Sequence, residues 1–131
     1  MSAPNYAGAQ ALVLSEVSGP IYQAAKERGS AVTDAEKEQI DAYRATVNMR
    51  LMSTADPMKD AVENPETNVK TLSSPRVQGA GMVDLDGAIN SDVYLEGLDL
   101  AGNKIGKSKI ALRNNEDIAK GDIKLSFVAH N

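Results

Sequence analysis

The stretch MSAPNYAGAQALVLSEV, residues 1–17, indicates that the first part of this chain is helical. Its small and apolar side chains fall on nearly every side of a helix that we predict over residues 3–17. Pro4 stands in the first turn, where the amide hydrogen that it lacks would have no helical partner. A helix that is apolar all round is normally buried, so we expect other structure to surround it, with Gly8 allowing a close approach.

Downstream, the sequence predicts two more helical segments. Ser18-Gly19-Pro20 is expected to break the first helix and to start a short second one that ends near Gly29. Thr33 and Glu36 have the spacing of a capping box, which opens a longer amphipathic helix to about Met52. Its predicted apolar face carries Ile40, Tyr43, Val47 and Leu51.

A polar connection and a short helix follow. Asp56-Pro57 is predicted to end the long helix, and residues 57–75 to form a surface loop. Gly79-Ala80-Gly81 is interpreted as a tight crossing of two backbone segments, because a dinucleotide-binding fingerprint would need Gly or Ala where Asp84 stands. Asp84 is predicted to cap a last helical turn through Ile89.

From about Asp92 the sequence alternates with a period of two, which is typical of strands. The three alternating runs are Val93 to Glu96, Ile110 to Arg113 and Ile123 to Val128, with turn residues Gly102-Asn103 and Gly121-Asp122 between them. Three strands without a closing partner sheet indicate the beginning of a β-sandwich. We therefore expect an α+β chain with helices first and antiparallel strands of an incomplete β-sandwich afterwards.

Composition excludes several classes of function. Residues 1–90 carry 8 basic and 12 acidic side chains, and residues 91–131 carry 6 of each, so no basic stripe is available for nucleic acid. The absence of Cys excludes thiolate metal sites and thiol nucleophiles. No signal peptide is expected in this stretch, and the apolar run Ala11 to Leu14 is too short for a membrane span.

No catalytic or metal-binding constellation can be assembled from these residues. His130 is the only histidine, has no obvious partner in the sequence, and is interpreted as an ordinary strand residue. Asp84-Leu85-Asp86-Gly87 resembles the start of a calcium loop, but the next ligand positions hold Ala88, Ile89 and Leu95. We therefore predict no catalytic residue, no metal ligand and no cofactor site within the chain.

Three stretches, in order, resemble the subtilisin-like serine proteases. Met1-Ser2-Ala3-Pro4, followed by Ala7-Gly8-Ala9, is similar to the family's Gly-Thr-Ser-Met-Ala/Ser-x-Pro segment, which leads into a buried helix. Arg50 to Ala55 is similar to the next helix, which typically ends Leu-x-x-Thr-Ala. Ser74 to Asp84 resembles the Gly-x-Gly-x-Val/Ile segment that closes the catalytic domain, in the form of the large cell-envelope proteases of Gram-positive bacteria, including the lactocepins.

The resemblance implies a domain organisation. Residues 1–90 would be the C-terminal helical segment of a subtilisin-like α/β peptidase domain, and residues 91–131 the opening strands of a fibronectin type III-like domain. The nucleophilic serine would immediately precede Met1, so Met1, Ser2 and Pro4 would lie beside the active site, with Ser2 on the family's small Ala/Ser position. The catalytic Asp and His and the Asn of the oxyanion hole would all lie upstream. Residues 18–39 are longer and more charged than the equivalent loop of small subtilisins.

The function that the resemblance implies is that of a fragment of a secreted or cell-wall serine endopeptidase. The intact enzyme would hydrolyse peptide bonds through a Ser-His-Asp triad and could bind calcium, whereas this chain alone would be inactive. Its expected partners are the upstream part of the protease domain and the enzyme's protein or peptide substrates. The alternative is a stand-alone, non-catalytic surface or interaction module derived from a subtilase. An apolar first helix without its covering sheet favours the fragment.

Overall fold

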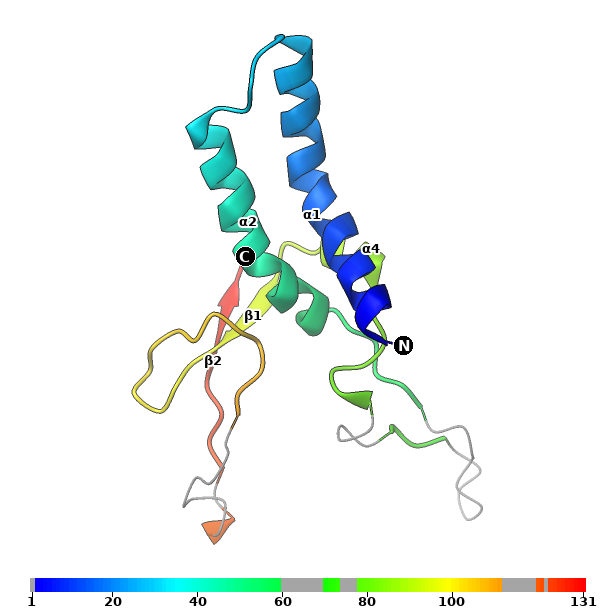
Figure 1. Ribbon diagram of the computed structural model, residues 1–131. Coiled ribbons are helices and arrows are strands. Elements are labelled where there is room, and N and C mark those ends of the chain that lie inside the picture. Colours follow the sequence, from blue (N-terminus) through cyan, green and yellow to red (C-terminus); the bar gives the residue numbers. More distant parts are fainter. Residues whose placement is uncertain (1, 60–69, 74–77, 112–119, 122) are drawn as a thin grey trace.

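The computed structural model describes residues 2–59, 70–73, 78–111, 120–121 and 123–131 (Figure 1). Within these ranges the elements are α1 (Ser2–Glu27), α2 (Asp34–Ser53), α4 (Leu85–Asn90), β1 (Tyr94–Gly97) and β2 (Phe127–His130). Figure 1 shows α1 and α2 side by side as a hairpin, with α4 beside the start of α1; β1 lies against α2, and β2 pairs with β1. The chain is thus a mixed α+β fold, as the sequence predicts at this coarse level.

α1 is one continuous helix through Pro20, so the predicted break at Ser18-Gly19-Pro20 is wrong. A proline inside a helix removes one backbone hydrogen bond and costs about 3 kcal/mol. Ala25, one turn beyond the proline, is buried although the surrounding helical surface is exposed. We infer that packing of α1 along α2 maintains the helix past Pro20, which local propensity alone does not reveal.

α2 begins where the capping box predicts. Thr33 is the N-cap: its Oγ1 accepts the Glu36 backbone N–H at 3.3 Å, and its own N–H donates to Glu36 Oε2 at 2.8 Å. Arg28, the first residue after α1, forms an ion pair with the same Glu36 carboxylate at 2.9 Å. The predicted apolar face is confirmed for Ile40, Val47 and Leu51, which are buried together with Met49, while Tyr43 is partly buried.

We expect Thr33→Ala to lower the free energy of unfolding by about 1 kcal/mol, because the amide of Glu36 then loses its side-chain acceptor. Urea denaturation followed by circular dichroism measures this change. Ser30→Ala, which removes an exposed hydroxyl three residues before the cap, is the matched control. Its free energy of unfolding should stay within about 0.5 kcal/mol of that of the parent chain. Equal effects of the two substitutions would contradict the role of the cap.

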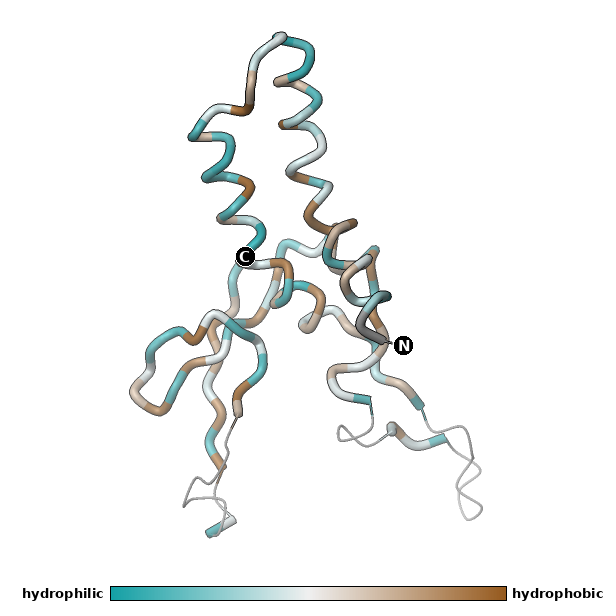
Figure 2. The backbone as a smooth tube through the Cα atoms, in the orientation of Figure 1, coloured by the Kyte–Doolittle hydropathy of each residue, from teal (hydrophilic) through white to brown (hydrophobic). Residues whose placement is uncertain are grey.

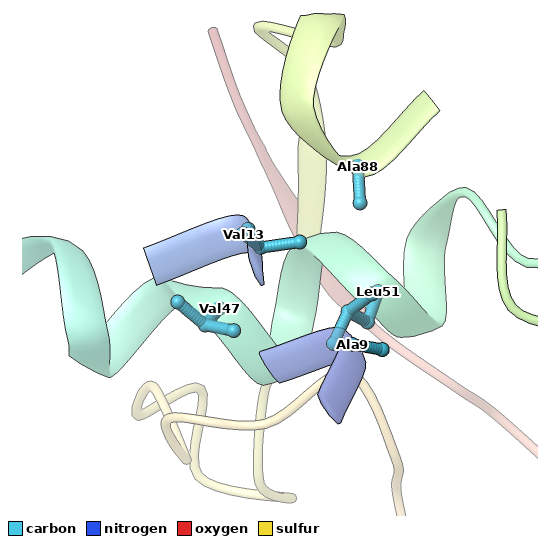
Figure 3. Packing of buried hydrophobic residues seen from close by; sticks show 5 residues of the cluster. All are labelled: Ala9, Val13, Val47, Leu51 and Ala88. Carbon is cyan, nitrogen blue, oxygen red and sulfur yellow. The ribbon is translucent and has the colours of Figure 1, made fainter. Parts of the chain in front are cut away.

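The core lies where three helices meet. Figure 3 shows its five buried members, Ala9 and Val13 from α1, Val47 and Leu51 from α2, and Ala88 from α4. Partly buried apolar side chains surround the cluster: Tyr6, Leu14, Tyr43, Leu85 and Ile89. In Figure 2 the tip of the hairpin is largely hydrophilic, so apolar packing is concentrated at the end of the hairpin near the N-terminus and α4.

The predicted backbone crossing is present at Gly81. Asp56 and Met82 form an antiparallel bridge, with N–H···O distances of 2.9 and 2.8 Å. A Cβ atom at Gly81 would stand 2.7 Å from the carbonyl carbon of Asp56 and closer still to its oxygen, and the φ of Gly81 is +127°. Asp84 then caps α4 by accepting the Gly87 N–H at 2.9 Å, as predicted.

The strand pair is shorter than the sequence predicts. β1 and β2 are antiparallel, with Tyr94 opposite His130 and Glu96 opposite Val128. The predicted run from Ile123 enters the ladder only at Phe127, because β1 ends at Gly97 and the chain turns back through the Leu98–Lys104 bridge. Of the run Ile110 to Arg113, residues 110–111 are not strand and the rest lies outside the described residues. Gly102, with φ +86°, and Gly121, with φ +74°, stand in turns as predicted, whereas Asp122 lies outside the described residues.

Candidate functional site

The start of α1 carries the residues that the resemblance assigns next to an active site. Ser2 is the first residue of α1 and Pro4 stands exposed in its first turn, whereas Met1 lies outside the described residues. The following turns are anchored to α2, since Tyr6 Oη donates to Asn48 Oδ1 at 2.9 Å and Gln10 Nε2 donates to the same oxygen. Partial burial raises the pKa of the Tyr6 hydroxyl. The helix start is therefore held firmly against α2.

One side of α1 is open, contrary to the expectation that structure surrounds this helix. Among the described elements α1 packs against α2 and α4. Leu12 is 54% exposed and Tyr22 is 58% exposed. A Cβ atom at Gly8 or Gly19 would meet no other atom within 4 Å, so the close approach predicted at Gly8 is not made by the described residues.

His130 does have a partner, which corrects the interpretation of it as an ordinary strand residue. Its Nε2 lies 2.8 Å from Glu96 Oε2, and its ring stacks on Tyr94 with the centroids 4.7 Å apart and the planes 11° from parallel. Both contacts follow from the strand register, which puts His130 opposite Tyr94, two residues from Glu96 on the same face of β1. The sequence conceals this arrangement because the partners lie more than 30 residues from His130.

Glu96 has three partners, one on β2 and two in the loop after β1. In addition to His130 it accepts the Gly106 N–H at 2.9 Å, and Lys104 Nζ lies 3.9 Å from its Oε2. The hydrogen bond with His130, then the Gly106 N–H and the positive charge of Lys104, hold the pKa of the Glu96 carboxyl below its usual range. The sequence alternation sets Val93 and Leu95 apart from Tyr94 and Glu96, and the structure buries Glu96 while Leu95 is exposed, so no local signal in the sequence reveals this site.

Arg50 extends the arrangement onto α2. Its guanidinium lies 5.1 Å from the ring centroids of both Tyr43 and Tyr94, and its Nη1 donates to the Ser91 carbonyl at 2.7 Å. Tyr94 therefore contacts both Arg50 and His130. We call the set Tyr43, Arg50, Tyr94, Glu96 and His130 the clasp, because it joins α2, β1 and β2.

The nearby hydroxyls have structural partners. Ser53 Oγ accepts the Leu95 N–H at 2.9 Å, and Ser108 Oγ donates to the Leu95 carbonyl. The imidazole Nε2 of His130 faces Glu96, so it is not directed at either serine. The clasp thus has the geometry of a structural joint, without a serine aligned to a histidine base.

The described part of the chain contains no group of three His, Asp or Glu side chains placed to hold a metal ion. Across the same residues, no helix combines the length and apolar character needed to cross a membrane.

Comparison of the chain with models of protein families, with curated proteins and with solved structures finds no match in any of the three. The likeness to subtilisin-like proteases therefore rests on the three stretches beginning at Met1, Arg50 and Ser74.

Proposed function

We propose that this chain is part of a secreted or cell-surface subtilisin-like serine endopeptidase. Residues 1–90 would form the C-terminal segment of its peptidase domain, and residues 91–131 would begin a fibronectin type III-like domain. The intact enzyme would cleave peptide bonds through a Ser-His-Asp triad whose members lie outside this chain. Its partners would be the remainder of the peptidase domain and protein or peptide substrates.

The open side of α1 is the observation that carries this proposal. The helix is apolar on nearly all sides, yet Leu12 and Tyr22 are more than half exposed and Gly8 faces open space. Apolar surface of this kind marks a site of contact with another structure. A peptidase domain in which this helix is central would supply the missing contacts.

The bridge between Asp56 and Met82 gives independent support. It joins the end of the second family-like stretch, which closes at Ala55, to the third, which contains Gly81 and Met82. Asp56 and Met82, which are 26 residues apart in the sequence, are therefore neighbours in space, as adjoining parts of one domain would be.

The start of α1 suits the position assigned to a nucleophile. The first amides of a helix are unpaired and carry the positive end of its dipole, which favours an oxyanion formed beside them. Under this proposal the nucleophilic serine immediately precedes Met1, and Ser2 is a neighbour of the active site. Met1, Ser2 and Pro4 would shape the site without taking part in bond cleavage.

A fluorophosphonate probe, which reacts with activated serines, tests the proposal. The polypeptide that contains this sequence, as its host cell makes it, should be labelled, and its Ser2→Ala variant should be labelled equally. The 131-residue chain by itself should stay unlabelled. Labelling of the 131-residue chain, or loss of label in Ser2→Ala, would contradict the proposal, and an unlabelled natural polypeptide would favour a non-catalytic interaction module.

A further inference from the structure

Glu96 is the one buried polar or charged side chain among the residues that the structure describes, with 7% of its surface exposed. All three of its partners present a hydrogen: His130 from β2, Lys104 and the Gly106 N–H from the loop after β1. Burial of a charged carboxylate is tolerated only while such donors compensate for its lost hydration. The carboxylate charge is therefore central to how these segments are held together.

The contacts of Glu96 continue to the helical core. His130 stacks on one side of Tyr94, and Arg50 of α2 contacts the same ring. Arg50 is itself fixed by Tyr43 and by the Ser91 carbonyl. Through this series, β2 is attached directly to β1 and, by way of the Tyr94 ring, to α2.

Apart from the clasp, β2 is weakly held. Among the described residues it pairs with β1 alone, over four residues, and Phe127 on its other face is exposed. A two-stranded sheet is only marginally stable without further packing. Whether β2 stays attached to β1 should therefore depend strongly on the charge of the Glu96 carboxylate, which binds His130.

We propose that the clasp is a proton-operated latch: ionised Glu96 keeps β2 attached to β1 and α2, and protonation of Glu96 releases β2 while the helical core stays folded. This inference does not depend on the proposed protease function. The charged and titratable groups that face the carboxylate are His130 from β2 and Lys104 from the loop, with Arg50 of α2 across the Tyr94 ring. All of them are basic, so every one of these contacts weakens when Glu96 becomes neutral.

The direction of the pH dependence follows from the lowered pKa of Glu96. Its hydrogen bonds favour the ionised form in the folded chain, so the stabilisation is complete above the usual value of 4.5. It is lost as the pH falls below 4.5 through the lower folded-state pKa. The core cluster contains no titratable side chain and should stay folded at this lower pH. Its members are Ala9, Val13, Val47, Leu51 and Ala88.

Nuclear magnetic resonance of the full 131-residue chain tests the latch, because its only histidine is His130. At about pH 6, where carboxylates are ionised, cross-peaks between the rings of His130 and Tyr94 should be present. By about pH 3 they should be lost, while methyl signals of Val13 and Leu51 keep their folded positions. Glu96→Gln, which imitates the neutral carboxyl, should lack the cross-peaks already at the higher pH.

Asp99→Asn is the matched control, because Asp99 is a carboxylate of the same loop region that accepts the N–H groups of Ala101 and Asn103 and does not contact His130. It should keep the cross-peaks at about pH 6 and lose them in acid as the parent does. Three results would overturn the latch. These are persistence of the cross-peaks in acid, their loss together with the core methyl signals, and an Asp99→Asn variant that behaves like Glu96→Gln.

Discussion

Gly81→Ala lowers the free energy of unfolding by about 3 kcal/mol or more, the largest loss that we expect from any single methyl group in this chain. The added Cβ would overlap the Asp56 carbonyl, which is backbone and belongs to the bridge with Met82. Relief would require opening both N–H···O bonds between Asp56 and Met82. The φ of +127° adds strain, since it lies in a region that side chains with a Cβ rarely adopt. Chemical denaturation measures the loss.

Gly79→Ala separates the overlap from the effect of a positive φ. Gly79 has a φ of +67°, but a Cβ there would meet no atom within 4 Å. Gly79→Ala should therefore lower the free energy of unfolding by only about 1 kcal/mol, because alanine disfavours the left-handed backbone conformation. Equal losses at Gly79 and Gly81 would contradict the close crossing of the two backbones.

Leu51→Ala should lower the free energy of unfolding by about 3 kcal/mol. Leu51 is 2% exposed and stands in the cluster where α1, α2 and α4 meet, so truncation leaves a cavity between three helices. The same variant should lower the midpoint of thermal unfolding and weaken amide-hydrogen protection in α4, whose six residues depend on this contact.

Leu100→Ala is the control for Leu51→Ala, since Leu100 is 81% exposed in the turn after β1. The same substitution at Leu100 should lower the free energy of unfolding by less than about 0.5 kcal/mol. A loss at Leu100 as large as that at Leu51 would show that the helical cluster is not the main source of stability.

Local signals in the sequence predicted local structure well. The Thr33 cap and the Asp84 cap each follow from side chains that act within a few residues. The buried face of α2 also follows from spacing alone, because a helical period places its apolar side chains together. These features required no knowledge of the rest of the fold.

Features that depend on distant partners were predicted poorly. Pro20 stays inside α1 because α2 packs alongside, and nothing near Pro20 in the sequence indicates that packing. The contacts of His130 with Tyr94 and Glu96 require the register of two strands, and the contact of Tyr94 with Arg50 requires their docking on α2. The clasp was therefore missed, although each of its residues is visible in the sequence.

The residues assigned next to an active site, Met1, Ser2 and Pro4, rest on resemblance alone. Ser2 and Pro4 lie in the first turn of α1, a helix with an open apolar side, which is compatible with that assignment. The chemistry that would decide it belongs to the serine that the proposal places directly before Met1.

The most direct measurement is to map the fluorophosphonate label on the natural polypeptide by mass spectrometry after digestion with trypsin. We expect one labelled peptide, which contains a serine immediately followed by Met1 and ends at Lys26, the first basic residue of this sequence. The label should be on that serine, with Ser2 unmodified. A natural polypeptide without label, or a label on Ser2, would contradict the assignment of this chain to a subtilisin-like peptidase.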